Sequence, residues 1–227
     1  MYAFVTGPLA WLTFGIFFVG ILVRIATYIR GLNWQMDRVT YQAFPAAGVR
    51  GAVRSVLYWL LPFGTHSWRF YPFFTILVFV FHICLLVTPV FLLGHNLLLQ
   101  ERWGFSLWTL PEAVTDGMTV ALIVAAVFIL LRRIALPEVR ILTTVYDYFI
   151  LLVSALPFFT GLMARYAVGD YSTWLLLHIF CGELLLILAP FTKLSHIVLF
   201  FMSRAQLGMD YGIKRGGMKP HSKGMAW

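Results

Sequence analysis

Residues 173–203 read TWLLLHIFCGELLLILAPFTKLSHIVLFFMS, a long apolar run in which only Glu183 and Lys193 are charged. A helix needs about 20 apolar residues to cross the hydrocarbon core of a bilayer. This stretch therefore predicts one membrane-spanning helix over 173–203, long enough to tilt or to project beyond the bilayer. It also contains His178 and His196, and a histidine inside a membrane helix usually has a specific role.

The composition of the whole chain indicates a membrane environment as well. Of the 227 residues, 61% are hydrophobic and 11% are charged, against about 45–50% and about 25% in a soluble domain. Four further apolar runs predict helices over 8–29, 71–99, 114–131 and 141–164. We therefore expect an all-α integral membrane protein of five transmembrane helices, forming a single membrane domain over 1–227.

Lysine and arginine are distributed unevenly between the two ends of these helices. Of the 17, only Arg102 and Arg165 fall on one side, and 15 fall on the other. By the positive-inside rule, this predicts a protein of the bacterial cytoplasmic (inner) membrane with a periplasmic N-terminus and a cytoplasmic C-terminus. This topology accounts for the net charge of +8 and predicts no nucleic-acid partner. The expected segments outside the bilayer are a cytoplasmic loop over 30–70 with a short interfacial helix over 56–61, a periplasmic loop over 100–113 and a cytoplasmic tail over 204–227.

The spacing of the two histidines in 173–203 predicts their positions in the bilayer. His178 and His196 are 18 residues apart, which is about five turns of about 3.6 residues, so a continuous helix presents both on one face. Their separation along the helix axis is about 27 Å, close to the thickness of the hydrocarbon core. We expect one of them near each side of the membrane.

A second pair of histidines, His82 and His95, lies in the helix predicted over 71–99, and this helix runs antiparallel to 173–203. His95 is expected to meet His178 at the outer level, and His82 to meet His196 at the inner level. Two imidazoles on one iron leave no open position, which suits electron transfer by a b-type haem. The sequence therefore predicts two haem b groups with these four histidines as iron ligands. Covalent c-type attachment is excluded because the chain has no Cys-x-x-Cys-His motif.

The inner ligand has two candidates. Thirteen residues separate His82 from His95, which leaves them about 140° apart on an ideal helix. Pro89 lies between them and permits a kink or a local π-type widening that would recover the register. His66, which precedes the same helix, is the alternative inner ligand.

The last predicted helix carries a recognisable pattern. Leu177-His178, Gly182 and the segment Pro190-Phe191-Thr192-Lys193-Leu194-Ser195-His196 resemble the haem-ligating last helix of the cytochrome b (gamma) subunit of respiratory nitrate reductase. Residues Leu110-Pro111-Glu112-Ala113-Val114 are similar to the loop after the second helix of that family. The resemblance puts His95 at the position of an outer haem ligand.

Over its whole length the chain is more similar to the cytochrome b subunits of the Tmc, Hme and Dsr transmembrane redox complexes of sulfate-reducing bacteria. This resemblance implies a dihaem subunit that moves electrons between a membrane quinone pool, menaquinone, and partner redox subunits. The implied partners are a cytoplasmic iron–sulfur subunit related to heterodisulfide reductase and a periplasmic multihaem cytochrome c. The chain would then be the quinone-reactive electron-transfer subunit of an oxidoreductase complex.

Several polar side chains are candidates for handling the quinone, its protons or the haem propionates. Glu183 lies within an apolar run, and an intramembrane carboxylate is a functional candidate by default. It is expected to be protonated, to relay protons from a quinol, or to hydrogen-bond a neighbouring helix. The other candidates are Glu112, Asp116, Tyr166 and Asp170 for the quinone and its protons, and Arg102, Arg165 and Lys193 for a propionate or a quinone carbonyl. Simpler explanations exist, because acids favour helix starts and a lysine can snorkel to the headgroups.

Two other functions agree with the same composition. In the first, the chain is a haem-free membrane anchor or a transporter subunit whose histidines relay protons. A transporter is expected to show two related halves with interrupted helices, and the sequence has no such repeat. In the second, the haems are structural and there is no quinone site.

Overall fold

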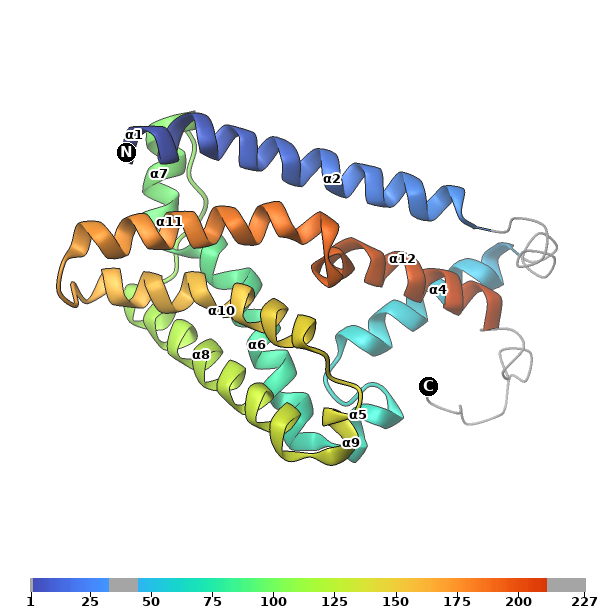
Figure 1. The fold of residues 1–227 in the computed structure, drawn as a ribbon. Helices are drawn as coiled ribbons and strands as arrows, with labels where there is room; N and C mark the ends of the chain where they lie inside the picture. Colours follow the sequence, from blue (N-terminus) through green and yellow to red (C-terminus); the bar gives the residue numbers. More distant parts are fainter. Residues whose placement is uncertain (1, 33–44, 212–227) are drawn as a thin grey trace. The chain divides into compact units, whose positions relative to one another are not determined.

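The computed structural model describes residues 2–32 and 45–211, and every regular element within these ranges is helical (Figure 1). Five helices are long and apolar enough to cross a membrane, which confirms the predicted number of spans and makes the chain a multi-pass membrane protein. These five spans are Tyr2–Arg30, Pro72–Phe91, Glu112–Ala135, Val145–Arg165 and Tyr171–Phe191.

The chain divides into two compact units. The first consists of Met1–Phe14 and Ile76–Ile187, and the second of Gly15–Thr75 and Leu188–Trp227. Of the segments predicted outside the bilayer, residues 33–44 of the loop and 212–227 of the tail lie outside the described residues, as do the basic side chains that they contain.

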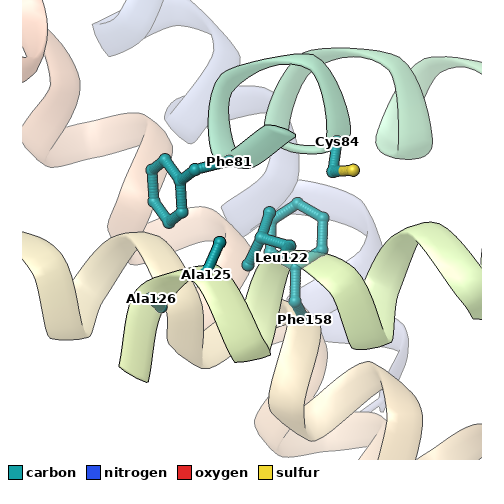
Figure 2. Packing of buried hydrophobic residues seen from close by; sticks show 6 residues of the cluster. All are labelled: Phe81, Cys84, Leu122, Ala125, Ala126 and Phe158. Carbon is teal, nitrogen blue, oxygen red and sulfur yellow. The ribbon is translucent and has the colours of Figure 1, made fainter. Parts of the chain in front are cut away.

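The first unit is built around helices α8 and α10, which pack against each other (Figure 1). Its elements are α1 (Tyr2–Phe4), the π-helix η1 (Val5–Leu9), the start of α2 (Ala10–Arg30), most of α6 (Pro72–Phe91), α7 (Leu93–Trp103), α8 (Glu112–Ala135), α9 (Pro137–Arg140), α10 (Val145–Arg165) and α11 (Tyr171–Leu188). In Figure 2, the core of this unit is formed by Phe81, Cys84, Leu122, Ala125, Ala126 and Phe158. Cys84 is a free thiol that packs as a small apolar side chain.

The second unit is built around helices α4 and α12, which also pack against each other. Besides the rest of α2, its elements are α4 (Pro45–Leu60), α5 (His66–Phe70), the 3-10 turns η2 (Ala189–Phe191) and η3 (Lys193–Ser195), and α12 (His196–Tyr211). The two helices approach closely at Gly208, where a Cβ atom would clash with the carbonyl oxygen of Gly51. The guanidinium of Arg204 stacks on the ring of Trp59 at 4.4 Å.

Helix α4 is longer than the interfacial helix predicted over 56–61, because it begins at Pro45. The first turns of α4 contain mainly small residues and an arginine, so the sequence has no apolar run there that would predict a helix. Proline fits the first turn of a helix, and α12 packs closely against α4 at Gly51 and Ser55.

The prediction of one continuous helix over 173–203 is wrong. Helix α11 ends at Leu188, and α12 begins at His196 after the turns η2 and η3. Pro190 has no N–H to donate, and Thr192 adopts extended backbone angles (φ −118°, ψ −173°). The Thr192 hydroxyl then accepts a hydrogen bond from the backbone N–H of Leu194 at 3.3 Å, which begins the next helical segment. The five-turn spacing of His178 and His196 on one helix face therefore does not exist.

The prediction of one helix over 71–99 is also wrong. Helix α6 ends at Phe91, Leu92 is extended (φ −72°, ψ 132°), and α7 begins at Leu93. The break comes three residues after Pro89, where the sequence had suggested only a kink. His82 and His95 consequently lie on different helices, and the 140° offset calculated for one ideal helix does not apply.

Candidate functional site

A pair of histidine rings forms the most distinctive polar feature of the first unit. His95 on α7 and His178 on α11 face each other with their ring centroids 5.8 Å apart and their planes 19° from parallel. Both side chains are partly buried. The structure thus brings together the two histidines that the sequence paired at the outer level.

Each ring of this pair is oriented by a backbone carbonyl group. The Nδ1–H group of His95 donates to the carbonyl oxygen of Pro89 at 2.8 Å, and that of His178 donates to the carbonyl oxygen of Pro157 at 2.8 Å. Because a carbonyl oxygen can only accept, each ring carries its proton on Nδ1 and keeps a lone pair on Nε2. Histidines that bind a metal through Nε2 are usually held in this way.

The break before α7 positions His95 and is stabilised by side chains. The ring of His95 satisfies the carbonyl of Pro89, while the amide nitrogen of Asn96 donates to Val90 at 2.8 Å and to Leu92 at 3.1 Å. The backbone N–H of Leu110 donates to the carbonyl oxygen of Phe91 at 2.9 Å. All the carbonyl groups released by the break therefore have partners, as buried backbone groups require.

Asn96 is the central residue of this arrangement, and its removal is expected to destabilise the protein. It is 1% exposed, and its Oδ1 atom also accepts the backbone N–H of Leu107 at 2.8 Å. Asn96→Ala would leave buried polar groups without partners, so we expect a loss on the order of 3 kcal/mol in unfolding free energy. Thermal unfolding in detergent measures it, with the exposed neighbour Leu97→Ala as control. Equal stability of the two variants would contradict this account.

The ring of His178 reaches α10 because residue 161 is a glycine. A Cβ atom at Gly161 would lie 2.9 Å from Nδ1 and 3.0 Å from Cε1 of His178. Even alanine at this position would therefore push the ring away from the carbonyl oxygen of Pro157.

The other candidate ligands are divided between the two units. His82 lies on α6 in the first unit, and its Nδ1–H donates to the carbonyl oxygen of Val78 at 2.7 Å. His196 begins α12 in the second unit, and its Nδ1–H donates to the carbonyl oxygen of Lys193 at 2.8 Å. In both rings the backbone carbonyl orients Nδ1, so Nε2 is the nitrogen that would bind a metal. The pairing of these two histidines stays a prediction.

His66, the alternative inner ligand, differs from the other four candidates. It is exposed at the start of α5, and its ring packs edge-on against Phe70 at 4.5 Å. Within the described part of the chain, no backbone carbonyl accepts a hydrogen bond from either of its ring nitrogens.

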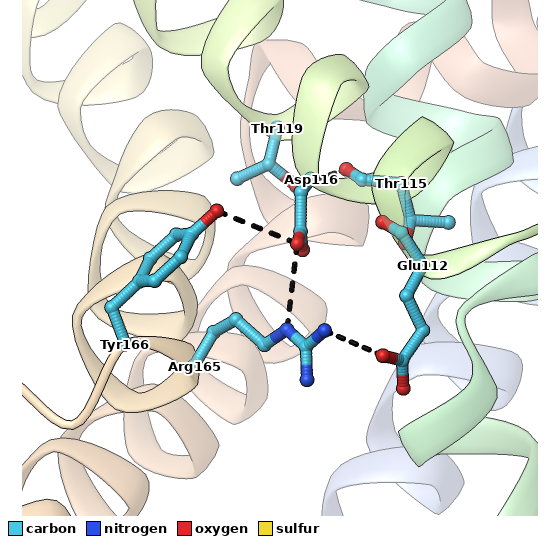
Figure 3. Close-up of polar contacts among 6 residues, drawn as sticks. All are labelled: Glu112, Thr115, Asp116, Thr119, Arg165 and Tyr166. Carbon is cyan, nitrogen blue, oxygen red and sulfur yellow. Dashed lines mark hydrogen bonds and ion pairs between the residues drawn. The ribbon is translucent and has the colours of Figure 1, made fainter.

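The predicted acids Glu112 and Asp116 lie together with Arg165 in a surface cluster (Figure 3). The guanidinium of Arg165 bonds Glu112 at 2.6 Å and Asp116 at 3.5 Å, and the hydroxyl of Tyr166 lies 3.5 Å from Asp116. The cluster joins the start of α8 to the end of α10. These contacts give all four side chains a structural role, while the quinone and propionate roles stay predictions.

Glu183 is the most unusual carboxyl group among the described residues. It lies in the middle of α11, is only 7% exposed, and neither of its oxygens has a hydrogen-bond partner within the described chain. Burying an unpaired carboxylate is costly. This placement favours the protonated and proton-relay alternatives over a fixed hydrogen bond to a neighbouring helix.

The remaining predicted polar residues lie near helix ends. Arg102 donates to the hydroxyl of Thr6 at 3.3 Å, and the side chain of Lys193 is exposed in η3. Asp170 precedes α11 and accepts hydrogen bonds from the hydroxyl groups of Thr173 and Ser172 and from the backbone N–H of Thr173. These bonds to the charged form lower the pKa of Asp170 to about 2. Asp170 therefore caps the start of α11 as an ionised carboxylate at neutral pH, and its role toward a quinone stays a prediction.

Comparison with known proteins places the chain among relatives. It is 64% identical over 217 residues to a protein of Nitratidesulfovibrio vulgaris strain Hildenborough, and the match covers 96% of each chain. The chain belongs to the family of that protein. The name of this family member, "Protein", describes no activity. No protein-family model matches the chain.

Membership of this family therefore does not indicate a substrate or a cofactor, and the evidence about function comes from the residues of the site itself. Within the described residues, no group of three or more His, Cys, Asp and Glu side chains is placed to hold a bare metal ion. A pair of imidazoles suits a haem, in which the porphyrin supplies the other iron ligands.

Sequence reasoning missed three residues that build the site: Asn96, Pro157 and Gly161. Asn96 follows His95 directly, and a polar side chain inside an apolar stretch was the available signal. The contributions of Pro157 and Gly161 had no sequence signal, because both depend on the approach of α11 to α10.

Proposed function

We propose that the chain is a dihaem cytochrome b, the membrane subunit through which a larger redox complex exchanges electrons with a quinone pool. The proposal follows the resemblance to the cytochrome b subunits of nitrate reductase and of the Tmc, Hme and Dsr complexes. It includes menaquinone as the substrate, a periplasmic N-terminus, and the two implied partners, an iron–sulfur subunit and a multihaem cytochrome c.

The observation that carries the proposal is the facing pair His95 and His178. An imidazole nitrogen binds a transition metal at about 2 Å, so two imidazoles on opposite sides of one metal ion have ring centres about 6 Å apart. The observed 5.8 Å agrees with that requirement. The donor set fits as well, because both rings keep Nε2 free while Nδ1–H is held by a carbonyl oxygen.

In this proposal His95 and His178 hold one haem, and His196 holds the other with His82 or His66. A haem, when bound, supplies an iron that accepts and releases one electron. The protein residues keep the imidazoles in one tautomer, increase their basicity through the Nδ1–H bonds, and exclude water by burial. Arg102 and Lys193 are the candidate cations for propionates, while Arg165 binds two carboxylates.

Haem analysis of the purified chain tests the proposal. We expect an alkaline-pyridine spectrum of protohaem at about two haems per chain, as two bis-histidine sites require. Absence of haem from a folded, membrane-extracted protein would refute the proposal. Titration with a menaquinol analogue, with and without a site inhibitor, separates a quinone-linked cytochrome from an anchor with structural haems.

Gly161 provides a more specific test of the outer site. The Cβ of Gly161→Ala would displace the ring of His178 from Pro157, and loss of such a supporting contact lowers metal affinity by about 10–100-fold. Haem loss during dilution, followed by absorbance, is expected to be faster for this variant than for the wild type. Gly182→Ala on α11 is the matched control, because no atom lies within 4 Å of the position that its Cβ would take. Equal haem loss from both variants would contradict the role of Gly161.

Glu183 favours a second candidate, a haem-free subunit that relays protons. A buried carboxyl group to which the described residues offer no hydrogen-bond partner suits proton exchange in a membrane. This alternative predicts proton uptake by reconstituted vesicles that Glu183→Gln abolishes, together with no haem spectrum.

A further inference from the structure

A cleft in the second unit lies between the end of α2 and α12, away from the histidine pair. Its volume is about 450 Å³, within the range of small-molecule sites. It is lined by Arg24, Thr27, Tyr28, Gly31, Leu32, Leu199 and Gln206. Arg24, Thr27 and Tyr28 follow one another at the spacing of a single helix face, so this face of the membrane helix α2 is polar.

The described lining offers hydrogen-bond donors and no carboxylate. The Nε–H of Arg24 donates to the carbonyl oxygen of Pro190 at 2.6 Å, which anchors the guanidinium and leaves its four other N–H groups for a ligand. The Oε1 atom of Gln206 accepts the hydroxyl of Tyr28, so its amide N–H groups are the remaining donors. Asp210, one turn beyond Gln206, does not line the cleft. Such a lining suits a ligand with accepting oxygens.

The surroundings of the cleft indicate that this ligand comes from the bilayer. Arg24 lies within the membrane-spanning segment Tyr2–Arg30. Beside it, Leu22, Val23 and Ile29 are 42–64% exposed and apolar, as expected for a surface in contact with lipid. Leu32 and Leu199 add apolar surface to the cleft itself. The ligand therefore has a polar head and an apolar tail.

We propose that this cleft binds the phosphate group of an anionic phospholipid, with Arg24 and Gln206 as its donors. A guanidinium prefers an anionic phosphate to a neutral carbonyl, because its fork of N–H groups matches the phosphate oxygens. Arg30, at the end of α2, increases the positive potential. Basic pockets between membrane helices commonly hold acidic lipid headgroups. The proposal is independent of haem.

Native mass spectrometry of the full chain in detergent tests this site. Phosphatidylglycerol and phosphatidylcholine with the same acyl chains are added in parallel. We expect one phosphatidylglycerol to be retained in preference to phosphatidylcholine, because both carry a phosphate but only phosphatidylcholine adds a choline cation, which Arg24 and Arg30 would repel. Arg24→Gln and Gln206→Leu are each expected to lower this retention by about tenfold, the effect of losing a hydrogen bond to a charged group.

The controls separate lipid binding from folding and from other ligands. Arg54→Gln removes a cation that stacks on Tyr58 of α4 and does not line the cleft, so retention should not change. Gln206→Leu leaves the bond between Arg24 and Pro190 intact, and circular dichroism verifies folding of every variant.

Equal retention of both lipids, or retention unaffected in both cleft variants, would overturn the proposal. Displacement by millimolar inorganic phosphate would assign the site to free phosphate, and displacement by a menaquinone analogue would assign it to a quinone; either result overturns the lipid assignment.

Discussion

His178→Ala is expected to remove one of the two haems proposed per chain. The imidazole of His178 faces that of His95, with the ring centroids 5.8 Å apart. An alanine leaves the iron with one protein ligand, which lowers its affinity and opens a coordination position. The pyridine spectrum should therefore fall from about two haems per chain to about one.

His95→Ala should give the same result, because the two rings form one site. Leu177→Ala is the control, since Leu177 precedes His178 on α11 and is 43% exposed. Retention of two haems by either histidine variant would show that this pair does not ligate iron. Loss of both haems from a folded variant would show that the two sites are not independent.

His82→Ala and His66→Ala are expected to differ, and this comparison decides the inner ligand. The Nδ1–H of His82 donates to the carbonyl oxygen of Val78, so Nε2 is the nitrogen that would bind a metal. The exposed ring of His66 packs against Phe70 instead. We therefore expect His82→Ala to lose one haem and His66→Ala to keep both, measured by haem content and by the low-spin signals in electron paramagnetic resonance.

The reverse result would assign the inner site to His66. In either case, His196→Ala should lose the same haem as the variant of the histidine that pairs with it, His82 or His66. If neither variant loses haem, the inner site does not use a histidine that precedes Pro89. Double variants with His178→Ala identify which haem is lost, because loss of different haems is additive.

The sequence predicted the spans well because each depends on local composition. An apolar run of about 20 residues is a membrane helix wherever it packs, and each of the five runs overlaps one helix long enough to span a membrane. The pairing of His95 with His178 was also predicted, because it requires only antiparallel spans and matching depth. Helix α4 was only partly predicted, because its first turns contain small residues that form no apolar run, and α12, which packs against it at Gly51, is distant in the sequence.

The sequence by itself determined that this is a helical membrane protein of five spans with histidines inside them. Only the tertiary structure decided where two long apolar runs break, at Leu92 and between Leu188 and His196. A proline removes one backbone hydrogen bond, but the helix ends only if other groups take up the released carbonyls. Asn96 and Leu110 do so at the first break, and Arg24 does so at the second. These partners are either distant in the sequence or reach the carbonyl groups only after the helix has ended, so no local sequence pattern predicts them.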